Sequence, residues 1–496
     1  MSEIVVIGAG VGGLAAAVRL AGAGHRVTVH ERSGAVGGKL ASFERDGFRF
    51  DTGPSLLTLP DVFTGLGLAL RPEPLDPVVR HFFPDGTVLD SSADHDVFLE
   101  RIATALGPEA AHDWARFWRR AERVWHASWE SVLQRPVTAA TLARLSWRVR
   151  DLAAIAPGRS LRALGRRYLR DRRLRMLLDR YATYAGADPR RAPAALAAIP
   201  YAELAFGGWY LPGGLSTLAE ALRARCAELG VRIELDSPVA AIVADRKVPG
   251  VRPTDGHEVR AGRKVSGVRL ADGREVRADV VVSNVDAATL YRDLLPTPRA
   301  LAGLADRSLA GFVLLLGVRG ETRELAHHNV FFPRDYDAEF DAVFGGPGRR
   351  ARPAGDPTVF VTRAPDPAVR PAGHEAWFVL VNAAPQGTGE AQVDWRRAGL
   401  AEAYRDRVLE VLAARGPDVR NRLVFAEIRT PADLADATGA PGGAIYGTAG
   451  GLIRPANRGP VDGLFLVGGS AHPGGGLPMV TLSAQIAAAQ IGPAVP

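Results

Sequence analysis

Cysteine is almost absent from this chain of 496 residues, which contains only Cys226. A single thiol excludes an internal disulfide framework and any zinc or iron–sulfur site built from several cysteines. Its setting, ALRARCAELG, predicts a buried helix residue and not a nucleophile. No basic segment precedes the first apolar run, as it would in a signal peptide, so we expect a cytoplasmic protein.

Long hydrophobic runs are also missing. No uninterrupted apolar stretch reaches the ~20 residues of a membrane-spanning helix, so we expect none, while contact with a membrane surface stays open. No internal repeat is visible, and His327 and His328 have no partners at metal-site spacing, so no metal is expected. The length, with 47% hydrophobic and 23% charged residues, is typical of a soluble enzyme with two or three domains.

The chain opens with a nucleotide-binding motif. Residues 4–13, IVVIGAGVGG, are an apolar run followed by Gly8, Gly10 and Gly13 in G-x-G-x-x-G spacing; a predicted helix and a second strand lead to Glu31, 23 residues after Gly8. The glycines allow a tight turn, close approach of a pyrophosphate and helix–strand packing, and the helix N-terminus faces the phosphates. Glu31 suits the ribose hydroxyls, so the sequence predicts a dinucleotide site.

Three further glycine-bearing segments favour FAD over NAD. The doublet Gly37–Gly38 follows the acid, DTGPS occupies 51–55, and VGGSAHPGGGLP occupies 467–478 ahead of a final helix. The doublet would let backbone lie against a phosphate or ribityl chain, and the last helix N-terminus would face the polar edge of a flavin ring. An NAD-only domain needs neither feature, and no second G-x-G-x-x-G motif is present, so no NAD site is expected.

Positive charge is concentrated in residues 141–180, which carry twelve arginines and three aspartates, a balance of +9 against +7 for the whole chain. Such a patch can contact nucleic acid or anionic lipid, or simply face solvent. No nucleic-acid recognition motif accompanies it, so we expect no nucleic-acid partner.

A predicted helix over 108–134 carries tryptophans on one face and arginines on the other. The residues are Trp114, Trp118, Trp125 and Trp129, and Arg116, Arg119, Arg120 and Arg123. One interpretation is a core helix with a wet basic back. The alternative is an aromatic stripe that lines an apolar tunnel or lies in a bilayer interface.

Five motifs carry a resemblance to a known family. E-x5-G-G-K, DTGPS, GGWYLPGGLSTLAEAL, ADVVVSN and LFLVGGSAHPGGGLPMVTLS together resemble the flavin-dependent carotenoid desaturases of the bacterial phytoene-desaturase type. Within that family, HPGGGLPMVTLS is most similar to the 1-hydroxycarotenoid 3,4-desaturase branch. The resemblance implies FAD, a linear carotenoid substrate, peripheral contact with a membrane surface, and oxygen or a quinone as the final electron acceptor.

The implied fold is α/β: a glutathione-reductase-type FAD-binding Rossmann fold with an interleaved mixed-sheet substrate domain and a helical membrane-facing element. The FAD-binding domain would be discontinuous, comprising residues 1–75, 205–294 and 426–496. Residues 76–204 and 295–425 would form the substrate-binding and membrane-associating domain, helical around 108–180.

The resemblance also assigns cofactor contacts by position. The ADP half would be held by Gly8, Gly10, Val11, Gly12, Gly13, Glu31, Arg32, Gly37, Gly38 and Lys39, with Val239 at the adenine. The flavin would be flanked by Thr52, Gly53, Pro54 and Ser55, and the ribityl chain and ring lined by Gly468, Gly469, Ser470, Leu477, Pro478, Met479 and Val480. Gly469 stands where many related flavoproteins carry an acid, which puts an acidic contact to the ribityl chain in doubt.

The expected reaction is hydride transfer from the carotenoid to the flavin, with loss of a proton from the neighbouring carbon. No residue is identified as the base. For His472 we favour a hydrogen bond that fixes its loop, for Asp51 a turn cap, and for Glu203 either a substrate-facing or a surface acid. Alternatives are a phytoene desaturase forming neurosporene or lycopene, another amine-oxidase-like flavoenzyme, and a prenyl-lipid carrier without enzymatic activity.

Overall fold

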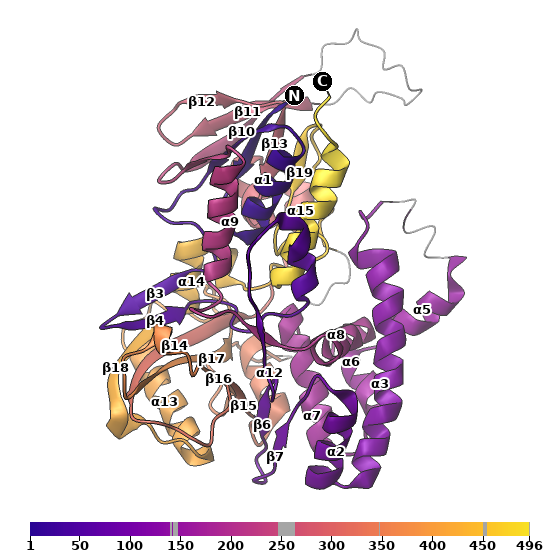
Figure 1. Ribbon diagram of the computed structural model, residues 1–496, viewed down its shortest axis with the longest axis vertical. Coiled ribbons are helices and arrows are strands. Elements are labelled where there is room, and N and C mark those ends of the chain that lie inside the picture. The colour runs from indigo at the N-terminus through magenta and orange to yellow at the C-terminus, as the bar shows by residue number, and fades with distance from the viewer. Residues whose placement is uncertain (139–140, 142–146, 247–262, 347, 450–453, 496) are drawn as a thin grey trace.

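The computed structural model describes residues 1–138, 141, 147–246, 263–346, 348–449 and 454–495. Figure 1 shows two bodies, one above the other. The upper body holds both termini and a parallel sheet, and the lower body holds a large mixed sheet with a block of helices beside it. Strands of the upper sheet come from the start, middle and end of the chain, so the chain passes between the bodies several times.

Five parallel strands form the upper sheet. Their order is β19 (Leu464–Leu466), β13 (Val280–Ser283), β1 (Glu3–Ile7), β2 (Arg26–His30) and β9 (Arg232–Glu234). Because side chains alternate along a strand, Ile4 and Val6 of β1 enter one core while Val5 and Ile7 enter another.

Helices cover the face of this sheet that carries Ile4 and Val6. They are α1 (Val11–Gly22), α9 (Thr217–Glu228) and α15 (Leu477–Ile491). Cys226 lies in α9 and is fully covered, and burial raises the pKa of its thiol to about 12. The prediction of a buried helix residue is therefore confirmed.

A three-stranded antiparallel sheet lies on the opposite face. It contains β10 (Val239–Arg246), β11 (Arg263–Leu270) and β12 (Glu275–Arg277). The predicted hairpin turn at Asp272–Gly273 is present, with Gly273 at a φ of 90°. Two further sheets have two strands each: β3 (Ser42–Arg45) and β4 (Phe48–Asp51) form a hairpin, and β5 (Glu73–Pro74) pairs with the distant β8 (Trp209–Tyr210).

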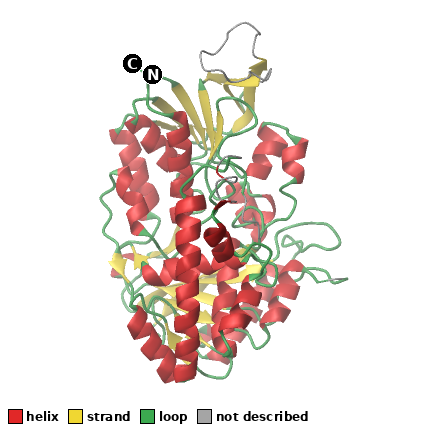
Figure 2. Ribbon diagram, turned by 90° about the vertical axis from the view of Figure 1, so that its right-hand side faces the viewer, coloured by secondary structure: helices red, strands yellow, loops and turns green. Residues whose placement is uncertain are grey.

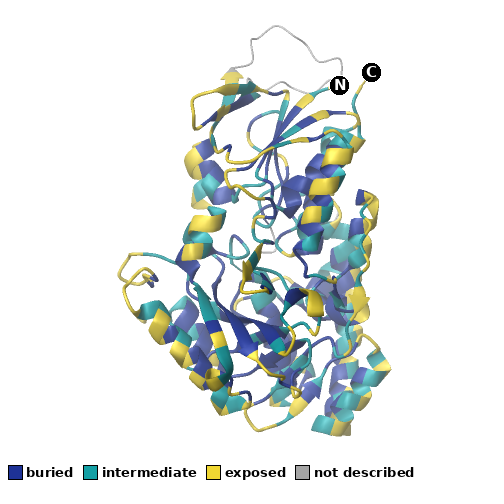
Figure 3. Cartoon of the chain, turned by 60° about the vertical axis from the view of Figure 1, so that its left-hand side comes forward, coloured by how far each residue is buried: buried dark blue, intermediate teal, exposed yellow. Residues whose placement is uncertain are grey.

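Seven strands form the lower sheet. In order they are β18 (Leu423–Arg429), β14 (Ala310–Arg319), β17 (His374–Ala383), β16 (Val359–Arg363), β15 (His328–Phe331), β6 (Arg80–Phe82) and β7 (Val88–Asp90). All pairs are antiparallel except β15 with β6. Helices α12 (Tyr336–Phe344), α13 (Leu400–Arg415) and α14 (Pro431–Thr438) belong to this body. The central strands of both large sheets, such as β1 and β14, are largely buried, and exposed residues follow the outer faces of the helices (Figure 3).

The helix block stands beside the lower sheet (Figure 2). It contains α2 (His95–Leu106), α3 (Pro108–Ser128), α5 (Val149–Ile155), α6 (Leu161–Tyr168), α7 (Arg172–Arg180) and α8 (Ala198–Ala205). A π-helical turn, Trp129–Leu133, continues α3, so the predicted helix over 108–134 is confirmed. No helix among the described residues is long and apolar enough to cross a membrane.

The tryptophan face of α3 packs into the core of this block. Trp114 and Trp125 are buried, whereas Trp118 and Trp129 are half-buried; Trp118 stacks on His95, and Trp129 stacks on Trp125. The interpretation as a core helix is therefore confirmed.

Much of the arginine-rich segment is engaged in internal ion pairs. Arg170 donates to the buried Asp113, and Arg162 pairs with Asp179 at 2.9 Å. Other pairs are Arg173 with Asp171 and Asp85, Arg162 with Asp337, and Arg148 with Asp151. Arg166 and Arg167 are exposed and have no carboxylate partner among the residues that the structure describes. The surface charge of this segment is therefore smaller than its sequence indicates.

Candidate functional site

A turn of glycines joins β1 to α1. Gly8 has a φ of 95°, and Gly10 caps the helix without a side-chain hydrogen bond. A Cβ atom at Gly13 would collide with the carbonyl oxygen of Gly8. Only glycine therefore permits this spacing of strand and helix, and the first N–H groups of α1 have no side-chain cap.

The other predicted glycine segments meet this turn. The Gly37 N–H donates to the Ala9 carbonyl at 2.9 Å, and a Cβ atom at Gly38 would lie 3.2 Å from Gly10 Cα. A Cβ atom at Gly12 would lie 3.0 Å from Gly468 Cα. The structure thus brings together three segments that the sequence pattern singled out separately.

Asn284 lies at the centre of these segments, and sequence reasoning missed it. It follows β13, and its side chain lies 2.7 Å from the Cβ positions of both Gly10 and Gly12. A Cβ atom at Gly468 would collide with the amide oxygen of Asn284. The motif ADVVVSN contained the signal, since a polar residue directly follows an apolar strand of a parallel sheet.

Glu31 is buried at the end of β2, beside the glycine turn. Its Oε2 accepts the Ala9 N–H at 2.7 Å, and its Oε1 accepts the N–H and hydroxyl of Ser33. Because a carboxylate accepts about four hydrogen bonds, Oε2 keeps capacity for a ribose hydroxyl. The Ser237 N–H donates to the Glu31 carbonyl at 2.8 Å, which places the start of β10, at Val239, near this acid.

The DTGPS segment, residues 51–55, is fixed by hydrogen bonds to other parts of the chain. Asp51 accepts the N–H groups of Leu215 and Ser216 at 2.7 and 2.8 Å, which confirms its predicted role as a cap. The Thr52 hydroxyl donates to the Ala41 carbonyl. A Cβ atom at Gly53 would collide with the Lys39 carbonyl, so this segment lies directly against the Gly37–Lys39 loop.

The return loop, residues 467–478, ends at the uncapped N-terminus of α15. His472 Nε2 donates to the carbonyls of Val132 and Arg135 at 3.1 and 2.9 Å, so the predicted loop-fixing role is confirmed. The Ser470 hydroxyl accepts the Ala287 N–H. Gly476 precedes the helix at a φ of 100° and no side chain caps it, which leaves N–H groups for a ligand.

Three cations gather near the return loop with one acid. Burial lowers the pKa of Lys39 to about 8 and that of Arg454 to about 10. Lys39 donates to the carbonyls of Ala444 and Ile445, and Arg307 pairs with Asp286 at 3.1 Å. The cluster Lys39–Arg307–Arg454–Asp286 therefore carries excess positive charge when Lys39 is protonated, which favours an anionic ligand nearby.

Two predicted site residues have different surroundings from those expected. Arg32 is exposed and donates to the Asp436 carbonyl at 2.6 Å. Glu203 is 2% exposed, and its Oε1 accepts the Tyr181 hydroxyl at 2.7 Å. The interpretation of Glu203 as a surface acid is therefore wrong, because α8 turns this face into the helix block.

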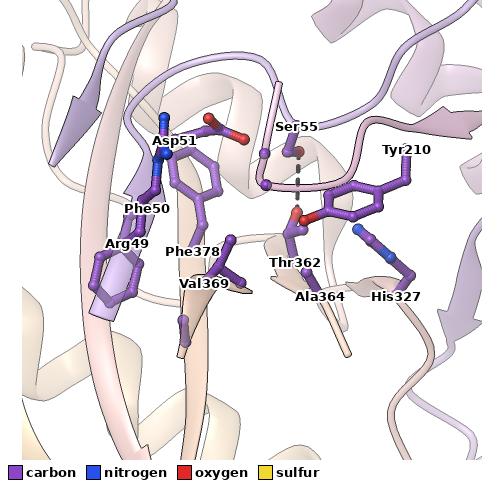
Figure 4. A pocket seen from close by; sticks show the side chains of 13 residues that line it. Arg49, Phe50, Asp51, Ser55, Tyr210, His327, Thr362, Ala364, Val369 and Phe378 are labelled. Carbon is purple, nitrogen blue, oxygen red and sulfur yellow. Dashed lines mark hydrogen bonds between the residues drawn. The ribbon is translucent and has the colours of Figure 1, made fainter. Parts of the chain in front are cut away.

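A pocket opens beside the DTGPS segment, between β4 and the ends of β16 and β17 (Figure 4). Ser55 accepts the Thr362 hydroxyl at 3.0 Å within it, with Tyr210 and His327 to one side and Asp51 to the other. Burial lowers the pKa of His327 well below its usual value, so this imidazole is neutral.

Residues 11–492 match the family described as flavin-containing amine oxidoreductase. The chain belongs to that family. Membership confirms the predicted FAD-dependent oxidoreductase. Such a cofactor fits the close-packed glycines of the turn at Gly8–Gly13, the loop at Gly37–Gly38 and the return loop at Gly468, which we call the glycine cradle. Glu31 and the uncapped N-termini of α1 and α15 fit it as well.

Similarity to curated members of this family extends over the whole chain. It is 34% identical to the 4,4'-diapolycopene oxygenase of Methylomonas sp, over 98% of this chain and 97% of that protein. It is 34% identical to the hydroxyneurosporene desaturase of Cereibacter sphaeroides (99% and 97% covered) and 28% identical to the 1-hydroxycarotenoid 3,4-desaturase of a Flavobacterium (98% of each). The resemblance to carotenoid desaturases is therefore confirmed.

Solved structures share the fold. A putrescine oxidase variant matches with a TM-score of 0.63 at 15% identity, over 99% of this chain and 98% of that one. An oxidoreductase from Methanosarcina mazei matches with a TM-score of 0.62 at 18% identity, over 97% and 99%. These TM-scores support the mixed α/β fold of flavin-dependent amine oxidoreductases. Because the sequence identities are low, the matches carry no argument about the substrate.

Substituting Gly13 tests the glycine cradle, with Gly22 in the same helix as the control. In Gly13→Ala the new methyl group meets the Gly8 carbonyl, so α1 must shift, and we expect at least a 100-fold loss of FAD affinity, or about 3 kcal/mol. Nothing lies within 4 Å of a Cβ at Gly22, so Gly22→Ala retains FAD. Titration of the flavin-free protein, followed by flavin fluorescence, measures both; equal affinities would contradict the cradle.

Lys39 gives the flavin-free protein a pH-dependent stability. Its pKa is about 8 in the folded state against 10.5 in a model peptide, so between these values the unfolded chain holds a proton that the folded chain has lost. Unfolding free energy must therefore rise with pH across this window, by up to roughly 3 kcal/mol. Urea unfolding at pH 7.5 and 10 should show this rise in the parent protein and not in Lys39→Met; parallel changes in both would contradict it.

Proposed function

We propose that this flavoenzyme desaturates a linear carotenoid, and that its reaction is the 3,4-desaturation of a 1-hydroxycarotenoid. The supporting observation is full-length similarity, at 28–34% identity, to curated enzymes whose names specify hydroxyneurosporene, a 1-hydroxycarotenoid or 4,4'-diapolycopene. The second candidate is an oxygenase acting on a carotenoid, because 4,4'-diapolycopene oxygenase is as similar as hydroxyneurosporene desaturase.

We propose a glutathione-reductase-type arrangement for the cofactor. The pyrophosphate would lie against Gly10, Gly12 and Gly38, with a ribose at Glu31 and the adenine toward Val239. Contact of the glycine turn with the 37–38 loop supports this placement, as does the uncapped start of α1. The flavin ring would lie between the DTGPS segment and the N-terminus of α15.

The proposed domains follow from the same placement. The FAD-binding domain comprises residues 1–75, 205–294 and 426–496, and residues 76–204 and 295–425 form the substrate-binding domain. The five-stranded sheet takes its strands from the first set, and the seven-stranded sheet takes nearly all of its strands from the second.

The helix block supplies an apolar environment beside the proposed flavin site. Its core contains Trp114, Phe117 and Leu177, and Met479 of α15 packs against the same core. When bound, FAD would accept a hydride from the substrate. The protein itself would hold the polyene in place and exclude water. No charged side chain is needed at the reacting carbon, because the conjugated chain delocalises the positive charge that develops there. The terminal acceptor, oxygen or a quinone, stays a prediction.

We propose that the outer end of the helix block contacts the membrane surface. Val149, the first residue of α5, is 72% exposed, Trp147, two residues before it, is 85% exposed, and Phe206, after α8, is 41% exposed. Phe206 packs on Trp125, and Arg148 bonds Ser131 just beyond α3, so these side chains belong to one end of the block. Exposed tryptophan beside arginine is typical of a bilayer interface.

Coexpression in cells that accumulate a 1-hydroxycarotenoid tests the reaction. We expect one further conjugated double bond, seen as a red-shifted product by chromatography, and no product from Gly13→Ala. Conversion of phytoene alone would indicate a phytoene desaturase, and an oxygen-containing product an oxygenase. Oxidation of a soluble amine, or a purified protein that takes up no FAD, would contradict the proposal.

Flotation with anionic vesicles tests the membrane surface. Arg166→Glu with Arg167→Glu should weaken binding about tenfold or more, since each arginine contributes about 1 kcal/mol near anionic lipid. Trp147→Ser with Val149→Ser should weaken it as well. Arg349→Glu with Arg350→Glu changes the net charge equally, beyond α12 in the lower body, and serves as the control. Equal binding by all three variants would remove this surface from the proposal.

A further inference from the structure

A buried polar cluster lies inside the helix block. Arg180 ends α7, Tyr181 and Tyr184 follow in a 3-10 turn (Tyr181–Ala185), and Glu203 belongs to α8. Arg180 is 6% exposed, Glu203 is 2% exposed, and Tyr181 is fully buried. Burying charged groups this deeply costs free energy unless each polar atom finds a partner.

Two atoms of this cluster have no partner. Arg180 Nη2 donates to the Tyr184 hydroxyl at 2.8 Å, and the Tyr181 hydroxyl donates to Glu203 Oε1 at 2.7 Å. Arg180 Nη1 and Glu203 Oε2 are buried without a hydrogen bond to any described residue. The Arg180 guanidinium lies 5.9 Å from the ring centroid of Tyr181, whose hydroxyl bonds Glu203, and 5.0 Å from the ring centroid of Tyr184. Glu203 also interacts with the Tyr184 hydroxyl, and burial together with Glu203 raises the pKa of Tyr184. The cluster therefore contains one donor atom and one acceptor atom without a hydrogen bond, on two side chains that contact the same pair of tyrosines.

Aromatic rings connect the cluster to the DTGPS segment. The Arg180 guanidinium lies 5.8 Å from the ring centroid of Phe360. Phe360 in turn stacks on His328, with centroids 5.8 Å apart, and His328 Nε2 donates to the Ser55 carbonyl.

Tyr446 makes the connection to the return loop. A Cβ atom at Gly186 would lie 3.2 Å from the Tyr446 ring, and one at Gly475 would collide with that ring. The ring of Tyr446 thus lies between the segment that follows Arg180 and the loop that precedes α15. The ring of Tyr446 therefore separates the segment that follows the polar cluster from the return loop, which is proposed to line the flavin.

We propose that Arg180 and Glu203 bind a hydroxyl group of the substrate, next to the bond that is desaturated. A hydroxyl accepts one hydrogen bond from Arg180 Nη1 and donates one to Glu203 Oε2, which satisfies both atoms. A hydrocarbon end group would leave both of these atoms without a hydrogen bond. This inference rests on the proposed function and specifies its substrate: a hydroxyl at C1 lies two carbons from C3, so binding it here brings the 3,4 bond toward the return loop.

The variant Glu203→Gln tests this site. Tyr181 would keep the amide oxygen, so the amide NH2 would replace Oε2 and leave the substrate O–H without an acceptor. Arg180→Lys is the second variant, because lysine keeps the charge and loses the fork of donors. Glu339→Gln is the matched control: Glu339 is also buried, but both of its oxygens are bonded, to Thr358 and Asn382. Bound-flavin absorbance and thermal midpoints show whether each variant is folded.

Two measurements decide the outcome. The first is kcat/KM for a 1-hydroxycarotenoid and for the same carotenoid without the hydroxyl, in vesicles. The second is equilibrium binding of the 3,4-desaturated products with and without the hydroxyl, followed by carotenoid absorbance. We expect the parent protein and Glu339→Gln to prefer the hydroxylated compounds about 10- to 100-fold, and Glu203→Gln and Arg180→Lys to lose most of that preference.

The alternatives give different results. No desaturation of any carotenoid by the parent protein would overturn the proposed function itself. Desaturation without preference for the hydroxylated compound would overturn only this inference. Equal loss of kcat for both substrates in Glu203→Gln, with unchanged product binding, would also overturn it and identify Glu203 as a proton carrier.

Discussion

Backbone from three distant parts of the chain meets around Asn284 with no space for side chains. The turn at Gly8–Gly13, the loop at Gly37–Gly38 and the return loop at Gly468 touch one another through Cα atoms, carbonyls and the Asn284 amide. This close approach fixes α1 against β1 and aligns the N-terminus of α15 with the same region. The arrangement of the upper body follows from it, because the first segment joins β1 to α1, the second follows β2, and the third joins β19 to α15.

Arginine side chains occur in the interior of this protein as well as on its surface. Arg170 and Arg162 pair with the buried acids Asp113 and Asp179. Part of the basic segment 141–180 therefore stabilises the helix block through internal ion pairs. Arg180 and Arg454 are buried without a carboxylate ion pair among the described residues. Excess buried charge of this kind is costly and is common at binding sites. Both arginines lie near Tyr446, between the two bodies.

The sequence predicted features that depend on local backbone geometry. Glycine positions such as Gly13 follow from a strand–turn–helix motif within one stretch, and the structure shows the steric reason at each. Asp51 was predictable as a cap, but its partners, Leu215 and Ser216, were not, because they lie more than 160 residues away. The resemblance assigned Lys39 to the ADP half, and that assignment stays a prediction; the carbonyls that its ammonium group bonds, Ala444 and Ile445, were not predictable, because they lie more than 400 residues away. Long side chains with distant partners cannot be placed from spacing alone.

The strand order has a consequence for how the chain acquires its structure. β1, which is synthesised first, becomes the central strand of the parallel sheet; it pairs early with β2, but its other neighbour is β13, some 270 residues later. The outer strand β19 arrives later still. Contacts so distant in sequence form slowly and leave strand edges open during synthesis. A nascent chain would therefore present an incomplete glycine cradle until its last helix is available, and FAD bound there as proposed would be taken up only after that point.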